Sequence, residues 1–385
     1  MSNKTCIIGG GASALMCACF AGEDVMIFEN QDVVGKKILA TGNGRCNLTN
    51  INVNDGAFNI NVKKYLNQFN VDQTLQFFNS IGLEVYADEE GRVYPISNSA
   101  TSVLAVLKNY IKLKKNIEIN AKKCVKNVIF DKNKYKIEFD DETFCFFDKV
   151  VVASGNRTDL SIYDNMGIQS LNFLPSLCSL KTKQKQKRLA GVRVSNVVVK
   201  CDELKFEETG EVLFKEDALS GIVIFNLSSY MARAKKYNYK IKIDLASNIQ
   251  IGELINKLIV RKQNLKEQKV EDFLTGFFHK EINLCVLKMA NINTEKLVKD
   301  LTNSEIRQMC NIIKNLTFDS VSADNNNQVF SGGVLLEELD INLQSKKQKG
   351  LYFIGEVCNV DGVCGGYNLQ WAWTSGAIVG KQIWN

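Results

Sequence analysis

The chain has 385 residues, of which 45% are hydrophobic and 23% are charged, a composition typical of a folded globular protein rather than a disordered or fibrous one. No apolar run approaches the length of a membrane span, and no basic, apolar leader precedes the first strand, so we expect a cytoplasmic protein without a membrane partner. The net charge of +6 is too small to require a polyanionic partner. We interpret the densest basic tract, Lys181 to Arg188, as a solvated loop in preference to a nucleic-acid patch.

Cysteine and histidine usage excludes several kinds of site. The twelve cysteines are scattered without a C-x-x-C pair, which favours buried free thiols over a disulfide framework. The single histidine, His279, lies in an apolar, helix-like stretch. A metal site and a Ser-His or Cys-His catalytic pair are therefore not expected, and we assign His279 a structural role.

The first thirty residues carry the most specific local pattern. A short apolar strand runs from Thr5 to Ile8, and the turn G-G-G-A-S-A follows at residues 9–14. A helix-compatible stretch from Leu15 to Ala21 leads to a second strand, Val25 to Phe28, which ends in Glu29. This order of strand, glycine-rich turn, helix, strand and acid predicts a βαβ dinucleotide-binding unit.

Each small residue of this turn has an expected role. Gly9 permits the tight turn, Gly11 lets a pyrophosphate approach the backbone, and Ala14 lets the helix pack close to the strand. The helix N-terminus offers free N–H groups to phosphates. Glu29 lies 20 residues after Gly9, where an acid accepts from a ribose hydroxyl.

The remainder of the first half continues the α/β pattern. The loop from Gly35 to Asn50 is rich in polar donors and directly follows Glu29, so we expect it to pass along the bound nucleotide. Apolar spacing predicts a helix within residues 61–82, a second helix capped by Ser97 or Ser99 and ending near Ile111, a strand at 117–120 and a hairpin over 125–139. A buried strand at 150–152 ends on small residues, as suits a ligand at a sheet edge.

The pattern changes after about residue 165. Residues 177–245 contain short β-like runs, at 193–200, 210–214, 222–227 and 239–245, which predict a small antiparallel barrel or sandwich. Residues 251–315 are helical in spacing, and 318–334 are extended again. A strand at 350–356, a glycine-rich loop and a helix from Trp371 to Ile383 return to α/β character. Two glycine-rich loops aimed at one ligand from the two ends of the chain imply a discontinuous domain with an insertion.

At this level of detail the sequence resembles a known family. The blocks G-G-G-A-S-A, T-G-N-G-R-C-N, G-R-V-Y-P, S-G-G-V and G-G-Y-N-L-Q-W-A-W together look like the HI0933-like flavoproteins, nearly end to end. The resemblance implies a glutathione-reductase-type Rossmann domain that binds FAD, interrupted by an inserted β-barrel and a helical subdomain. We place the FAD domain at residues 1–165 and 330–385, the barrel at 166–250 and 316–329, and the helical subdomain at 251–315.

The resemblance also implies a set of cofactor-binding residues, carried over by position. It points to no catalytic residue, and where many relatives have Thr-His, this chain has Lys215-Glu216. The implied FAD-binding residues are Gly9, Gly11, Ala12, Ser13, Ala14, Glu29, Lys37, Gly44, Arg45, Cys46, Asn47, Val125, Ala153, Ser154, Gly155, Gly355, Glu356, Asp361, Gly362, Gly366, Asn368, Leu369 and Gln370.

The expected activity is an FAD-dependent oxidoreductase that transfers a hydride through non-covalently bound flavin. No C-x-x-x-x-C pair supports a disulfide reductase, and no second G-x-G-x-x-G marks an NAD(P)H domain, so electrons would come from the substrate or from transiently bound NADH or NADPH. The resemblance implies a small-molecule substrate, through amine oxidation or C=C reduction. The alternative is an RNA-directed enzyme that reduces a uracil in ribosomal RNA, or a flavin-bound RNA-interacting protein with little turnover. The substrate and the oligomeric state stay open.

Overall fold

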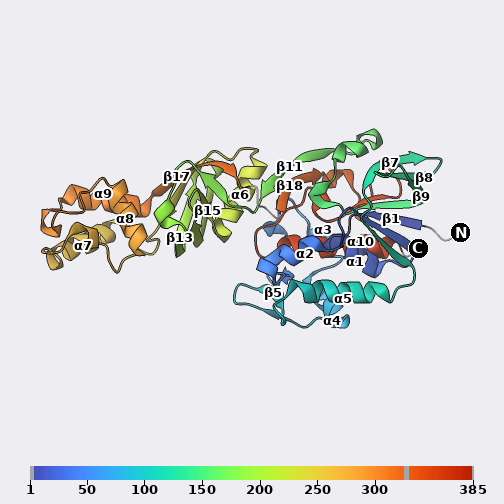
Figure 1. The fold of residues 1–385 in the computed structure, drawn as a ribbon, viewed down its shortest axis with the longest axis horizontal. Helices are drawn as coiled ribbons and strands as arrows, with labels where there is room; N and C mark the ends of the chain where they lie inside the picture. The colour runs from blue at the N-terminus through green and yellow to red at the C-terminus, as the bar shows by residue number, and fades with distance from the viewer. Residues whose placement is uncertain (1–3, 325–328, 384–385) are drawn as a thin grey trace. The chain divides into compact units, whose positions relative to one another are not determined.

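The computed structural model describes residues 4–324 and 329–383. Its contacts divide the chain into two compact units, Met1–Leu174 with Gln328–Asn385, and Pro175–Asn327. Each unit contains its own hydrophobic core, and Figure 1 labels the elements of both. Among the described residues, no helix combines the length and apolar character needed to cross a membrane.

The first unit is built on a parallel sheet whose central strands are near-continuous apolar runs, as expected for strands covered on both faces. The strand order is β19-β10-β1-β2-β6, so β1 pairs with β2 on one side and β10 on the other. Ile8 lies in register with Phe28 and Val152, which brings the residues after three strands to one edge. The strands are β1 (Lys4–Ile8), β2 (Asp24–Glu29), β6 (Ile117–Ala121), β10 (Lys149–Val152) and β19 (Leu351–Phe353).

Helices from opposite ends of the sequence pack together beside this sheet. A Cβ atom built on Gly376 would lie 2.4 Å from the Ser13 carbonyl oxygen, and one on Gly380 would lie 2.5 Å from that of Cys17. Glycine at these two positions therefore lets the last helix approach the first. The helices are α1 (Ala12–Phe20), α2 (Lys36–Ala40), α3 (Lys63–Leu66), α4 (Val71–Ser80), α5 (Ala100–Lys112) and α10 (Tyr367–Gln382).

Several helix boundaries differ from the prediction. The first helix starts at Ala12 rather than Leu15, and the last at Tyr367 rather than Trp371, because each begins directly after a glycine, Gly11 or Gly366. The stretch 61–82 forms two helices instead of one. Asn70 causes the break: its Oδ1 accepts from the Gln73 N–H at 2.9 Å and the Gln73 side chain accepts in return, a capping box that starts a new helix.

Three smaller sheets complete the first unit. One has the order β3-β5-β4, another has the order β7-β8-β9, and the third joins β11 to β18. Their strands are β3 (Thr49–Asn50), β4 (Val85–Ala87), β5 (Arg92–Pro95), β7 (Val125–Asp131), β8 (Lys134–Phe139), β9 (Phe144–Phe147), β11 (Ser170–Ser176) and β18 (Val329–Val334).

The second unit consists of a closed barrel and a group of helices. The barrel order is β12-β15-β14-β13-β16-β17. The strands are β12 (Leu180–Thr182), β13 (Arg193–Cys201), β14 (Phe206–Phe214), β15 (Ala218–Ser220), β16 (Lys240–Asp244) and β17 (Leu316–Ala323). The helices are α6 (Ile222–Arg233), α7 (Ile251–Asn264), α8 (Lys280–Met289) and α9 (Asn303–Lys314). The predicted fold class, a Rossmann-type α/β domain with an inserted barrel, is confirmed.

One predicted strand of the second unit is wrong. Residues 222–227 begin α6, although their β-branched side chains favour a strand. The buried positions Val223, Ile224, Leu227 and Met231 show the reason, because they recur with helical spacing once the window extends past residue 227.

His279 is the N-cap of α8, where its Nδ1 accepts from the Glu281 N–H at 3.3 Å.

Candidate functional site

An open cavity lies at the carboxyl edge of β1, β2 and β10, the edge at which open α/β sheets bind ligands. Its walls come from the turn after β1, the end of β2, the loop and helix α2 after it, the segment after β10 and the start of α10. The lining includes residues 8–13, 28–31, 35–38, 123–125, 153–158, Val33, Thr41, Val329, Glu356, Val360, Asn368, Leu369, Trp371 and Ala372.

The three glycines of the turn after β1 have different roles. The fold requires glycine at Gly9 and Gly10, whereas Gly11 leaves room for a ligand. A Cβ atom on Gly9, which has φ +98°, would lie 2.7 Å from the Ala153 carbonyl oxygen, and one on Gly10 would lie 2.5 Å from Val34 Cγ1. Gly11 differs, because a Cβ atom there would meet no protein atom within 4 Å. Gly11 lines the cavity, so its missing side chain leaves room for a ligand rather than for the protein.

Glu29, the last residue of β2, is hydrogen-bonded to the glycine-rich turn after β1. One carboxylate oxygen accepts from the Gly10 N–H at 2.7 Å, and the other accepts from the Gln31 N–H at 2.8 Å. These bonds fix the carboxylate at the cavity wall. Each oxygen keeps a further lone pair, so the group can still accept from a ligand hydroxyl.

Polar groups on the β10 side of the cavity are only partly satisfied within the protein. The Ser154 hydroxyl is buried without a hydrogen-bond partner in the described chain. Glu356 forms an ion pair with Lys37, and its other oxygen accepts from the Phe330 N–H at 3.1 Å. Gly155 lets this carboxylate approach, since a Cβ atom there would lie 3.1 Å from Glu356 Oε2. The Ser154 hydroxyl and the Lys37–Glu356 pair are thus available to a polar ligand.

Two helix N-termini reach the same cavity. Ala12 and Ser13 of α1 line it, as do Asn368 and Leu369 of α10. The first N–H groups of a helix have no intrahelical acceptor and carry a partial positive charge, so both ends favour an anionic ligand. Asn368 is held in place by Gly362, with its Oδ1 accepting from the Gly362 N–H at 3.0 Å and its Nδ2 donating to the Gly362 oxygen at 2.9 Å.

These groups match the chemistry of FAD. The pyrophosphate requires N–H donors and close backbone approach, which the α1 N-terminus and Gly11 offer. The ribose requires an acceptor, which Glu29 offers. The buried Ser154 hydroxyl lacks a protein partner in the described residues, and an elongated polar ligand would supply one. The cavity therefore fits the cofactor that the resemblance implies.

Not every predicted cofactor residue reaches the lining. Thirteen of them do: Gly9, Gly11, Ala12, Ser13, Glu29, Lys37, Val125, Ala153, Ser154, Gly155, Glu356, Asn368 and Leu369. The others lie outside it: Ala14, Gly44, Arg45, Cys46, Asn47, Gly355, Asp361, Gly362, Gly366 and Gln370.

Packing accounts for several residues of the second group. A Cβ atom on Gly355 would lie 2.4 Å from Ser13 Oγ, and one on Gly366 would lie 2.5 Å from the Thr49 carbonyl oxygen. Gln370 is fully buried, accepts from Thr49 Oγ1 at 2.7 Å, and donates to the hydroxyls of Thr74 at 2.9 Å and Thr374 at 3.0 Å. These three residues hold the elements that surround the cavity.

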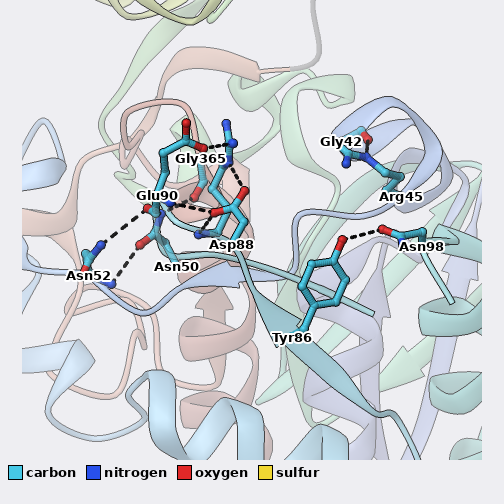
Figure 2. Close-up of polar contacts among 10 residues, drawn as sticks. Gly42, Arg45, Asn50, Asn52, Tyr86, Asp88, Glu90, Asn98 and Gly365 are labelled. Atoms are coloured by element: carbon cyan, nitrogen blue, oxygen red, sulfur yellow. Dashed lines mark hydrogen bonds and ion pairs between the residues drawn. The ribbon is translucent and has the colours of Figure 1, made fainter. Parts of the chain in front are cut away.

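Arg45 and Cys46, which also lie outside the lining, have contacts of their own within the protein. The Arg45 guanidinium lies 4.5 Å from the centre of the Tyr94 ring. Figure 2 shows the hydrogen bond that its Nε donates to the Gly42 oxygen, at 3.4 Å. Cys46 is fully buried in a left-handed backbone conformation, φ 61°. Burial raises the pKa of its thiol to about 11, so the sulfur is protonated at neutral pH.

Figure 2 also shows a polar network that the sequence did not reveal. The Asn50 amide donates to the Gly365 oxygen at 3.1 Å and to the Glu90 oxygen at 3.3 Å. Arg92 pairs with Asp88 at 2.7 Å and with Glu90. This network ties the β4–β5 turn to the glycine-rich loop before α10.

The sequence also missed part of the lining itself. Phe28, Asn30 and Gln31 belong to it, as do Lys123, Cys124 and residues 156–158. The available signal was their position directly after parallel strands, because the residues that follow such strands share one edge of a sheet. Residues 156–158, for example, come after β10.

The fold and the cavity together define a Rossmann-type protein whose sheet-edge cavity suits a dinucleotide cofactor. The family described as HI0933-like protein Rossmann domain matches residues 3–382, and the chain belongs to it. This match confirms the family resemblance, and the reductase among the relatives confirms the expectation of an oxidoreductase enzyme.

Named relatives align with nearly the whole chain. A 3-dehydro-bile acid delta(4,6)-reductase from Clostridium scindens is 30% identical over 98% of both chains. A ribosomal RNA dihydrouridine synthase from Escherichia coli is 27% identical over 96% of this chain and 95% of its own. Among solved structures, a 3-ketosteroid delta1-dehydrogenase from Sterolibacterium denitrificans has a TM-score of 0.50 at 12% identity, covers 100% of both chains, and shows the fold alone.

Proposed function

We propose that this protein uses non-covalently bound FAD to reduce a carbon–carbon double bond conjugated to a carbonyl group in a small molecule. The observation that carries the proposal is the chemistry shared by two relatives of different substrate class. One is named as a reductase of a bile acid and the other as a synthase of dihydrouridine. Both names describe the addition of hydrogen across a C=C bond.

The residues of the cavity would hold the cofactor along its length. The α1 N-terminus and Gly11 would receive the pyrophosphate, and Glu29 would accept from the adenosine ribose. Glu356, Ser154 and the α10 N-terminus would contact the remaining polar groups, and the Lys37–Glu356 pair would orient the Glu356 carboxylate. When bound there, FAD supplies the group that accepts a hydride and passes it on.

The reaction requires a reductant as well as a cofactor. NADH or NADPH, bound transiently, would provide the hydride, and the substrate would take up that hydride and one proton from water. The α10 N-terminus would favour negative charge beside it, because its N–H groups carry a partial positive charge. This preference for negative charge would favour the step in which the cofactor gains electrons.

Anaerobic stopped-flow absorbance tests the proposal. The expected result is bleaching of the flavin band by NADH or NADPH, followed by recovery on mixing with a 3-keto steroid that has a conjugated double bond. Bleaching by small amines without any nicotinamide would instead establish an amine oxidase. Recovery with oxygen but with no enone would contradict the proposal.

A second candidate is reduction of a uracil in ribosomal RNA. The Escherichia coli relative favours it, since its similarity also spans nearly the whole chain. The same stopped-flow experiment separates the two candidate functions. If RNA is the substrate, a uridine-containing RNA would restore the flavin band and the steroid would not.

A further inference from the structure

A further cavity of the first unit lies at the far ends of two helices that begin at the cofactor cavity. Helix α1 starts with Ala12, which lines the cofactor cavity, and ends with Phe20, which lines the further one. Helix α10 likewise contributes Asn368 to the first and Lys381 to the second. The rise along α1 from its first to its last residue is about 12 Å, so the two cavities are separate. We call the further one the lysine pocket, and it is lined by Cys19, Phe20, Tyr110, Lys114 and Lys381.

Lys114 brings a partly buried ammonium group to the lysine pocket. It follows the end of α5, where its backbone N–H donates to the Ile111 oxygen at 2.9 Å. Its Nζ donates to the oxygen of Ala21, the C-cap of α1, at 2.8 Å. An ammonium group has three N–H donors, so this bond leaves two for a ligand. Burial lowers the pKa of Lys114, because loss of water disfavours the charged form.

Lys381 provides a second ammonium group, which is exposed and comes from α10. Its Nζ lies 5.5 Å from the centre of the Phe20 ring and 5.1 Å from that of Phe69. In the same way, the Lys114 Nζ lies 5.8 Å from the centre of the Tyr110 ring. Aromatic faces attract cations, so these contacts hold both ammonium groups at the pocket without neutralising their charge.

No carboxylate offsets these two positive charges. None of the five lining residues is acidic, and within the described chain neither lysine forms an ion pair. Glu23, two residues after Ala21, pairs instead with Lys149 at 2.8 Å. Burial raises the pKa of the Cys19 thiol to about 12, so this thiol is uncharged at neutral pH. A partly buried ammonium group without a counter-ion is unfavourable, and an anionic ligand would supply that counter-ion.

The walls of the lysine pocket are aromatic rings packed on further rings. Phe20 and Tyr110 both contact Phe77, with ring centres 4.9 and 5.9 Å apart. Phe20 also packs edge-on against Phe69, at 5.4 Å. Rings fixed in this way offer flat apolar surface to a planar ligand. The pocket therefore combines aromatic walls with two positive charges.

We propose that the lysine pocket binds a small aromatic carboxylate. The ligand ring packs against Phe20 and Tyr110. The ligand carboxylate accepts charge-assisted hydrogen bonds from the ammonium groups of Lys114 and Lys381. Inorganic phosphate is the less suitable ligand, because it would leave the aromatic walls uncovered. This site is separate from the cofactor cavity and does not depend on the function proposed above.

Isothermal titration calorimetry of the full-length, FAD-loaded protein with 2-naphthoate tests this site. Because FAD then occupies the cofactor cavity, heat of binding reports a further site. We expect 2-naphthoate to bind at least about 10-fold more tightly than inorganic phosphate or the uncharged 2-naphthamide. The variant K114Q/K381Q should bind 2-naphthoate at least about 10-fold more weakly, since two charge-assisted hydrogen bonds are lost.

A matched variant removes the same charge beside the lysine pocket. K112Q/K115Q alters two exposed lysines that flank Lys114 but do not line the pocket, so it should bind 2-naphthoate within about twofold of the wild type. Equal weakening by both double variants would overturn the proposal, as would unchanged affinity in K114Q/K381Q or no binding by the wild type. Phosphate binding as tight as that of 2-naphthoate would overturn the aromatic class of ligand.

A single variant keeps the test decisive if K114Q/K381Q fails to fold. Lys381 is exposed, so K381Q should keep the fold, which an unchanged flavin absorbance ratio verifies. Its affinity for 2-naphthoate should fall at least about threefold. Wild-type affinity in K381Q would contradict a role for this ammonium group and overturn the proposed site.

Discussion

Replacing Gly11 with valine should greatly weaken FAD binding and leave the fold intact. The backbone at Gly11 is extended, φ −78° and ψ −169°, a conformation that any residue adopts. A Cβ atom there meets no protein atom within 4 Å. The valine side chain would therefore project into the cavity, where the pyrophosphate would lie.

The size of each effect follows from this geometry. Loss of a glycine N-cap costs roughly 0.5–1 kcal/mol, and the stiffer unfolded chain offsets about the same amount, so the apoprotein should change by less than about 1 kcal/mol. A branched side chain in the pyrophosphate position should weaken FAD binding by at least about 100-fold, about 2.8 kcal/mol. Gly9→Ala is the contrasting variant. Its Cβ atom would lie 2.7 Å from the Ala153 oxygen at φ +98°, and the fold itself should lose about 2–4 kcal/mol.

Two measurements on the apoproteins test whether Gly11 and Gly9 have these different roles. Urea unfolding followed by circular dichroism gives the free energy of unfolding, and flavin fluorescence quenching gives the FAD dissociation constant. Gly11→Val should alter only the second, and Gly9→Ala should alter the first. Wild-type FAD affinity in Gly11→Val would refute the placement of the pyrophosphate. Equal destabilisation of both apoproteins would refute the distinction between the two glycines.

Three further outcomes are expected. Arg45→Lys should leave FAD affinity within about twofold and cost at most about 1 kcal/mol in urea unfolding, since Arg45 stacks on Tyr94 outside the cavity; a clear loss of affinity would assign it to the site. Gln370→Leu should lower the free energy of unfolding by about 2–4 kcal/mol, because three buried threonine hydroxyls each lose a hydrogen bond, and an unchanged unfolding midpoint would contradict that. Acid denaturation should release all flavin, because the Cys46 thiol is buried and protonated, with a pKa of about 11; yellow precipitate would indicate a covalent link.

Local signals in the sequence were sufficient for the parallel sheet and the turn after β1. An apolar run, a glycine turn and an acid after the next strand are all set within thirty residues. The run at 222–227 shows the limit of such signals, since a six-residue segment with five β-branched or apolar residues does not distinguish a strand from a helix whose exposed face comes later.

A motif does not reveal which of its residues serve the ligand and which serve the fold. Gly11 and Gly355 both lie in glycine-rich blocks, yet only the second has a protein atom against its Cβ position. Gln370 bonds to Thr74, 296 residues away, and Asn50 to Gly365, 315 residues away. Contacts at such separations leave no local pattern, so their roles emerge only from the three-dimensional structure.

The packing of α10 on α1 has a consequence for the order of events during synthesis. Until residues 329–383 leave the ribosome, β10 lacks its neighbour β19, and the face of α1 that Gly376 and Gly380 cover stays open. One wall of the cavity is also missing, since Asn368 and Leu369 belong to it. A nascent or prematurely terminated chain thus has only part of the cofactor cavity. Complete loading with flavin would therefore require α10 to be folded against α1.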